Sequence, residues 1–220
     1  MVMKSKLVIC IKEWILKNTI KDMTLSTKMM SRIKPFIFIL LLFPSLIWIY
    51  KLSINALGVN PIEKLMHNIG ELALQLIIAT LIVSSLAQSK YLRALQNLRR
   101  MIGLFAFYYV LLHLATYIVL DHYFNWEFLL KDVLKRPFIS LGFISFLLLI
   151  PLALTSTKAM VKKLTYKVWK DIHKLIYIIA PLATMHFFLL TKADKKEPMI
   201  YLLIIFILYA WRIFIKAFKH

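Results

Sequence analysis

Six blocks of mostly apolar residues, each close to the ~20 residues that a helix needs to cross a bilayer core, constrain this chain more than any other feature. The blocks run over residues 35–50, 69–87, 101–120, 138–154, 172–190 and 199–218. Backbone groups in lipid must bond to one another, so helices are the form expected for segments of this length. The sequence therefore predicts an all-α fold, a polytopic membrane helix bundle of about six transmembrane helices.

The charged residues that connect the blocks predict an orientation. The formal net charge is +19, from 29 Lys and Arg against 10 Asp and Glu. Every second connection is strongly basic and the others are nearly balanced. The basic residues are Lys28, Arg32, Lys34, Lys90, Arg93, Arg99, Arg100, Lys158, Lys162, Lys163, Lys167, Lys170, Lys174, Arg212, Lys216 and Lys219. Because Lys and Arg accumulate in cytoplasmic connections, both termini are predicted to be cytoplasmic.

This charge has a second consequence, for the partners of the chain. It lies between apolar blocks and can contact the anionic headgroups of membrane lipids. No basic face alternates with exposed aromatic residues outside the blocks, so nucleic acid is not an expected partner.

The beginning of the chain differs from the rest. Residues 1–31 form a basic N-terminal extension, and residues 32–220 form the predicted six-helix domain. Within the extension, residues 8–16 suit a short amphipathic helix on the membrane surface, since they are too few to span and no small-residue cleavage site follows. Alternative starts that would shorten the extension are Met23, Met29 and Met30. Cys10 is the single cysteine, which excludes an internal disulfide and any iron–sulfur or zinc site built on cysteines.

Two of the six histidines lie inside apolar blocks at matching depth. At 1.5 Å per residue, His113 lies roughly 18 Å above Met101, and His186 lies roughly 20 Å above His173. Both blocks rise from the cytoplasmic side, so the two imidazoles share a level in the outer half of the membrane. Ionisable residues at this depth are candidates for function, and two facing imidazoles can ligate one haem iron. The other interpretation is that each ring bonds a carbonyl or hydroxyl group of a neighbouring helix.

A third histidine lies near the predicted cytoplasmic face. His173 is level with Arg99 and Arg100, which either anchor the chain in the membrane or pair with haem propionates. No second histidine matches this depth, so an inner haem would have another sixth ligand or none. Thirteen helical residues turn a side chain by about −140°, so His173 and His186 do not share a face unless Pro181 changes the helix phase.

The remaining histidines have simpler interpretations. His122 and His220 are predicted to be surface residues. His67 forms a polar stripe with Glu71 and Gln75, either a water-facing surface near the outer rim or a third outer-level cofactor site. Two alternatives to haem stay open: a transporter or proton relay that uses the intramembrane histidines with Glu71, and a metalloenzyme, which lacks a carboxylate near the histidine pair.

Several short sequence motifs occur in the order and spacing of a known family. They are Leu98–Leu104, Leu112–Tyr117, Lys135–Gly142, Leu152–Ser156 and Trp169–Tyr177, followed by His186. Over residues 32–216 the chain resembles the MsrQ family, the haem-binding membrane subunits of the bacterial periplasmic methionine sulfoxide reductase system. That family is related to the transmembrane domain of ferric reductases and NADPH oxidases. Ser84 and Ser85 replace the usual Thr-Pro, and Glu71 replaces a basic or aromatic residue, which leaves the role of the second block open.

The resemblance implies a function and a location. The fold would be ferric reductase-like, in the inner membrane of a Gram-negative bacterium, with one or two b-type haems on His113, His173 and His186. Electrons would pass from the quinone pool or a cytosolic flavin reductase to a periplasmic, molybdopterin-containing methionine sulfoxide reductase that repairs oxidised proteins. An FMN is also associated with the family. The haem would carry the redox chemistry, so the chain itself would be a non-catalytic electron-transfer subunit.

Overall fold

The computed structural model describes residues 27–89, 92–191 and 195–217. Most of the predicted N-terminal extension, residues 1–26, therefore lies outside the described residues. Every regular element in the described part is helical, and six helices are long and apolar enough to cross a membrane. These spans are Met29–Ser53, Pro61–Leu86, Arg93–Asp121, Pro137–Leu154, Tyr166–Leu190 and Lys196–Ile215. The predicted all-α bundle with six membrane-spanning helices is confirmed.

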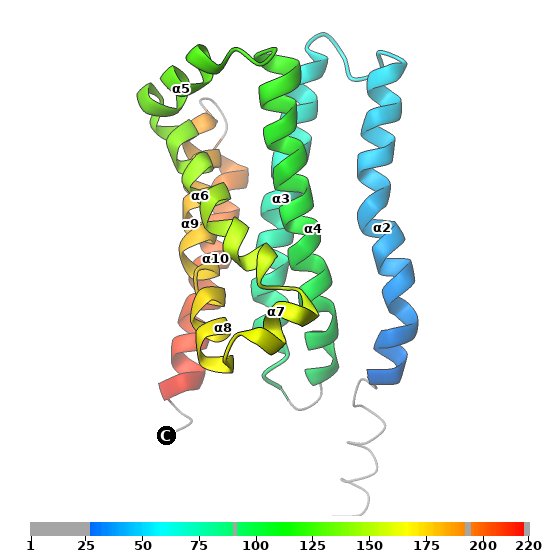
Figure 1. Ribbon diagram of the computed structural model, residues 1–220, viewed down its shortest axis with the longest axis vertical. Helices are drawn as coiled ribbons and strands as arrows, with labels where there is room; N and C mark the ends of the chain where they lie inside the picture. The colour runs from blue at the N-terminus through cyan, green and yellow to red at the C-terminus, as the bar shows by residue number, and fades with distance from the viewer. Residues whose placement is uncertain (1–26, 90–91, 192–194, 218–220) are drawn as a thin grey trace, which may run out of the picture.

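The long helices stand side by side (Figure 1). They are α2 (Thr27–Ser53), α3 (Pro61–Leu86), α4 (Gln96–Ala115), α6 (Pro137–Leu154), α9 (Ile176–Leu190) and α10 (Lys196–Ala217). Shorter elements are η1 (Arg93–Leu95), η2 (Thr116–Asp121), α5 (Trp126–Lys135), α7 (Lys158–Lys163) and α8 (Tyr166–His173). We call the two ends of the bundle the α5 end and the α8 end. The start of α2 and the end of α10 both lie at the α8 end, as an even number of spans requires.

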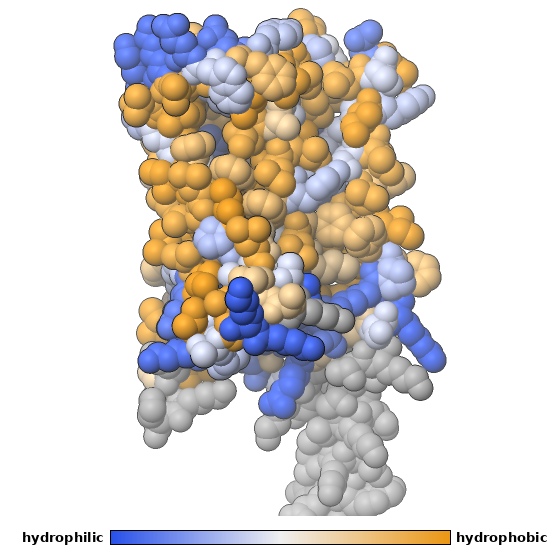
Figure 2. All heavy atoms as spheres, in the orientation of Figure 1, coloured by the Kyte–Doolittle hydropathy of each residue, from blue (hydrophilic) through white to orange (hydrophobic). Residues whose placement is uncertain are grey.

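Helix α3 lies at the centre of the bundle and α2 at its edge. In the most apolar window of α3, 56% of the residues are buried, against 6% in α2. Helix α2 contacts mainly α4. The Tyr109 hydroxyl donates to the Leu41 carbonyl, and the Phe38 ring meets the Phe105 ring edge-on. Figure 2 shows an apolar band between two charged ends on the face in view, which is the surface expected of a chain surrounded by lipid.

Four spans begin well before the expected blocks, the first at Met29, the second at Pro61, the third at Arg93 and the fifth at Tyr166, and one helix was not expected. The second span begins at Pro61 instead of Ile69, because proline suits the first position of a helix and Glu63 lies favourably in its first turn. The fifth span is divided at residues 174–175 between α8 and α9. Between the third and fourth spans the chain forms α5, whose first turn is capped by the side chain of Asn125.

Candidate functional site

His113 on α4 and His186 on α9 face each other inside the bundle. Their ring centroids are 6.3 Å apart, and the ring planes cross at 82°. The prediction that these two histidines share one level is confirmed. They come from helices far apart in the sequence, and the contacts of α3 with α9 and of α4 with α6 bring them together.

Each ring is held by the backbone of a neighbouring helix. His113 Nδ1 lies 2.9 Å from the Met66 carbonyl oxygen on α3, and His186 Nδ1 lies 2.6 Å from the Phe138 carbonyl oxygen on α6. A carbonyl oxygen only accepts hydrogen bonds, so Nδ1 must carry the proton in both rings. In a neutral imidazole the lone pair is then on Nε2, and a metal ion can bind there. The arrangement therefore offers two oriented nitrogen ligands.

The pair opens into a cavity of about 1050 Å³. Side chains of α3, α4, α5, α6 and α9 line it, and most are aliphatic or aromatic. The cavity reaches the upper end of the usual range for small-molecule and cofactor sites. Two cationic side chains, Lys64 and Arg136, also line it. Neither is a candidate from the sequence alone, because each lies in a connection whose charges are nearly balanced.

A polar cluster lies beside the cavity at the α5 end. The Asp132 carboxylate is buried, accepts a hydrogen bond from the Tyr117 hydroxyl at 3.1 Å, and lies 3.2 Å from Arg136 Nε. His122 Nε2 lies 3.6 Å from the same carboxylate, and the His122 side chain is only 13% exposed. The prediction that His122 is a surface residue was therefore wrong. In the π-helical turn η2, the His122 N–H donates to the Tyr117 carbonyl five residues earlier, one residue more than in an α-helix. Both side chains face α5.

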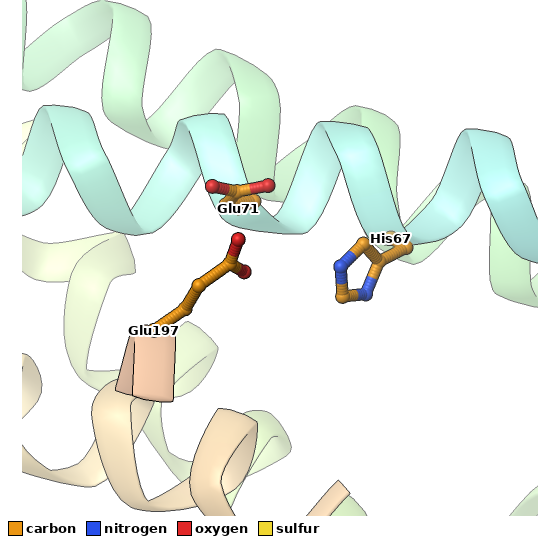
Figure 3. Close-up of side chains that lie close together, drawn as sticks. All are labelled: His67, Glu71 and Glu197. Atoms are coloured by element: carbon orange, nitrogen blue, oxygen red, sulfur yellow. The ribbon is translucent and has the colours of Figure 1, made fainter. Parts of the chain in front are cut away.

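His67 belongs to a second polar group at this end. Figure 3 shows His67 and Glu71 on α3, with Glu197 reaching from the first turn of α10 toward Glu71. One ligand atom from each residue lies within 4.8 Å of the others. The Tyr201 hydroxyl and the Gln75 amide also donate to Glu71, at 3.1 and 3.0 Å. The predicted stripe thus packs against α10, while the His67 ring lies on Phe187 with centroids 5.5 Å apart.

His173, Arg99 and Arg100 lie elsewhere, at the α8 end. They line a separate cavity of about 130 Å³. The His173 ring stacks on Trp169 at 4.2 Å, and its Nδ1 lies 3.1 Å from the Trp169 carbonyl oxygen. The buried indole nitrogen of Trp169 has no hydrogen-bond partner within the described part of the chain. As predicted from the helix phase, His173 and His186 face different spaces.

The comparison with known proteins decides the family. The profile of the ferric reductase like transmembrane component family matches residues 67–184. A protein-methionine-sulfoxide reductase heme-binding subunit MsrQ of Caulobacter vibrioides is 45% identical over 157 residues, which cover 71% of this chain and 75% of the relative. The chain belongs to the MsrQ family. The resemblance indicated by the short sequence motifs is therefore confirmed.

Other MsrQ proteins extend the similarity over more of the chain. The MsrQ of Azospira oryzae is 40% identical over 187 residues, covering 84% of this chain and 80% of the relative. The MsrQ of Herminiimonas arsenicoxydans is 44% identical over 162 residues, with 73% and 74% covered. These relatives are named heme-binding subunits of a protein-methionine-sulfoxide reductase.

Proposed function

We propose that this chain is a membrane subunit that transfers electrons on b-type haem, with His113 and His186 as the axial ligands. The spacing of the two rings carries the proposal. Two metal–nitrogen bonds of about 2 Å, with roughly 1 Å from each ring nitrogen to its centroid, place the centroids about 6 Å apart. The observed distance is 6.3 Å, which supports an iron atom held between the two rings.

The surroundings of the pair also suit a porphyrin. The cavity is mostly apolar and spans the space between α3, α4, α6 and α9. Lys64 and Arg136 supply positive charge for propionate groups at its rim. When bound, a haem supplies reversible one-electron exchange at its iron. The residues of the chain would hold both ligands in one tautomer and place the group near the α5 end.

We assign the entry of electrons to the α8 end. Arg99, Arg100 and the indole N–H of Trp169 suit an anionic or carbonyl-bearing donor. A second haem on His173, or an FMN, would require this cavity to widen, because its volume of about 130 Å³ is below the usual range for cofactors. A quinone or a cytosolic flavin reductase is the donor that the family resemblance favours.

The orientation gives the transfer a direction. The basic connections lie at the α8 end, so that end is cytoplasmic by the positive-inside pattern and the histidine pair lies toward the periplasm. We infer that electrons leave at the α5 end, to a periplasmic molybdopterin-containing methionine sulfoxide reductase that repairs oxidised proteins. The chain then lies in the inner membrane of a Gram-negative bacterium.

A reduced-minus-oxidised visible spectrum of the detergent-purified chain, with pyridine haemochrome quantitation, tests the proposal. Sharp b-type bands with at least one haem per chain are the expected result. A colourless protein after expression with a haem supply would overturn it and favour the alternative, a transporter or proton relay. That alternative uses the intramembrane histidines with Glu71, which lies in one group with His67 and Glu197.

A further inference from the structure

Both histidines of the pair are seated on a neighbouring helix in the same way. His113 Nδ1 bonds the Met66 carbonyl, and Gly70 follows four residues later on α3. His186 Nδ1 bonds the Phe138 carbonyl, and Gly142 follows four residues later on α6. In a helix, residue i+4 lies directly above residue i on the same face. Each imidazole therefore spans one helical turn, from a carbonyl oxygen to a glycine.

The two glycines have no side chain, and each imidazole ring occupies the space where a side chain would lie. A Cβ at Gly70 would lie 2.9 Å from both Cε1 and Nδ1 of His113. A Cβ at Gly142 would lie 2.9 Å from Nδ1 and 3.0 Å from Cε1 of His186. Contacts this close do not persist, and the ring in each case is fixed by its hydrogen bond. A methyl group at either position must push the ring away from its carbonyl.

A third membrane glycine provides the contrast. A Cβ at Gly103 on α4 would meet only the Thr80 Cγ2 atom, at 3.6 Å, which is an ordinary van der Waals contact. The chain has only four glycines, and Gly58 lies in the loop between α2 and α3. Close approach to an imidazole is thus a property of Gly70 and Gly142 and not of every glycine in the bundle.

We propose that Gly70 and Gly142 are positioning residues for the haem ligands. Each glycine lets its histidine lie flat on the neighbouring helix, keeps Nδ1 bonded to the carbonyl and fixes the rotation of the ring. The crossing angle of 82° between the ring planes follows from the positions of the two rings against α3 and α6. Groups that orient a metal-bound histidine typically change metal affinity by about 10-fold to 100-fold when they are removed. The inference rests on the proposed haem ligation and adds a function for two residues that touch no iron.

The test compares Gly70→Ala and Gly142→Ala with the control Gly103→Ala in the purified full-length chain. Haem content and the low-spin EPR spectrum of the ferric protein are measured, because nearly perpendicular imidazole planes give a more anisotropic signal than parallel planes. We expect haem binding about 10-fold to 100-fold weaker in the two variants, a shifted low-field EPR feature in the haem that remains, and an unchanged spectrum in Gly103→Ala. Wild-type haem content and EPR in both variants would overturn the proposal.

A second measurement separates positioning from general helix packing and does not need haem. The thermal midpoint in detergent is measured for Gly70→Ala alone and in a His113→Ala background. Removing the ring also removes the clash, so the loss of stability caused by Gly70→Ala should disappear in that background. An equal loss in both backgrounds would show that Gly70 acts through helix packing and would overturn the proposal.

The two measurements also distinguish a failure of the proposed function from a failure of this inference. If the wild-type chain bound no haem but the coupling between Gly70 and His113 persisted, the haem assignment would be wrong, and the role of Gly70 in positioning the His113 ring would be supported. If haem bound and no coupling were found, only the positioning role of Gly70 would be wrong.

Discussion

The facing imidazoles lead to a prediction that separates the histidines by role. His113→Ala or His186→Ala removes one of the two nitrogen ligands, and we expect loss of the low-spin haem spectrum in either variant. His67→Ala should retain that spectrum, because the His67 ring lies against Phe187 and belongs to the group with Glu71. Absorption spectra of equal amounts of purified protein check this. Loss of haem in His67→Ala alone would contradict the assignment.

A second prediction at this scale concerns the buried carboxylate of Asp132. It accepts a hydrogen bond from Tyr117 and forms an ion pair with Arg136, and His122 lies beside it. Asp132→Ala leaves these three partners without their shared acceptor. Hydrogen bonds to charged groups contribute about 1.5–3 kcal/mol each, so we expect α5 to open more often.

Limited proteolysis of the connection between residues 121 and 137 measures that opening. Cleavage should be faster in Asp132→Ala than in the wild type. Lys131→Ala, which removes an exposed charged side chain from the middle of the same helix, is the matched control and should cleave at the wild-type rate. Equal rates for Asp132→Ala and wild type would show that the cluster does not hold α5.

Sequence reasoning located the histidine pair but not its support. Depth along a helix follows from counting residues, so His113 and His186 could be placed at one level. Hydrogen bonds from a side chain to a backbone carbonyl leave no mark in the pattern of residue types, and neither Met66 nor Phe138 signals its role. The two glycines were visible in the sequence, but their meaning depends on which ring lies above them.

At the scale of elements, Pro181 on α9 creates a defect that α10 repairs. Proline has no N–H, so the carbonyl of Tyr177, four residues earlier, loses its helical partner. The Tyr209 hydroxyl donates to this carbonyl at 2.6 Å. In the membrane an unpaired backbone carbonyl is costly, so this bond ties the two helices together at a fixed register.

Replacing Tyr209 by Phe keeps the ring contact with Tyr177 and removes only the donor. We expect destabilisation by about 1–3 kcal/mol, the cost of leaving a buried acceptor unsatisfied. Pro181→Ala restores an N–H to the carbonyl, so Tyr209→Phe should cost little in that background. Thermal midpoints of the four proteins in detergent measure this cycle. An undiminished cost in the Pro181→Ala background would show that the hydroxyl acts elsewhere.

The elements themselves were largely predictable, and their irregular parts were not. Apolar block length identified six spans because lipid imposes a minimum length on a helix. The break between α8 and α9 and the π-helical turn η2 lie inside sequences that are apolar or mixed throughout, so hydropathy alone does not reveal them. Helix α5 was missed because its charges resemble those of a loop, although its apolar residues recur at helical spacing.

At the scale of the whole molecule, the two cavities lie on one path through the bundle. Ile77 on α3 and Leu149 on α6 line both cavities, and both side chains are buried. The stacked rings of Phe107 and Phe146, 6.3 Å apart, likewise lie one in each lining. Only a thin apolar layer therefore separates the space beside His173 from the histidine pair. The proposed donor end and the proposed haem site therefore share lining residues.

The path has a direction only if the bundle is inserted with the α8 end in the cytoplasm, and this can be measured with single cysteines. In a Cys10→Ser background, Glu127→Cys places a thiol on α5 and Lys163→Cys places one on α7, both at exposed positions. The basic α8 end should stay inside. A membrane-impermeant maleimide, added to cells with a permeabilised outer membrane, should therefore label Glu127→Cys and leave Lys163→Cys unlabelled until lysis. Labelling in the reverse order would place the histidine pair near the cytoplasm, and electrons leaving at the α5 end could not reach a periplasmic reductase.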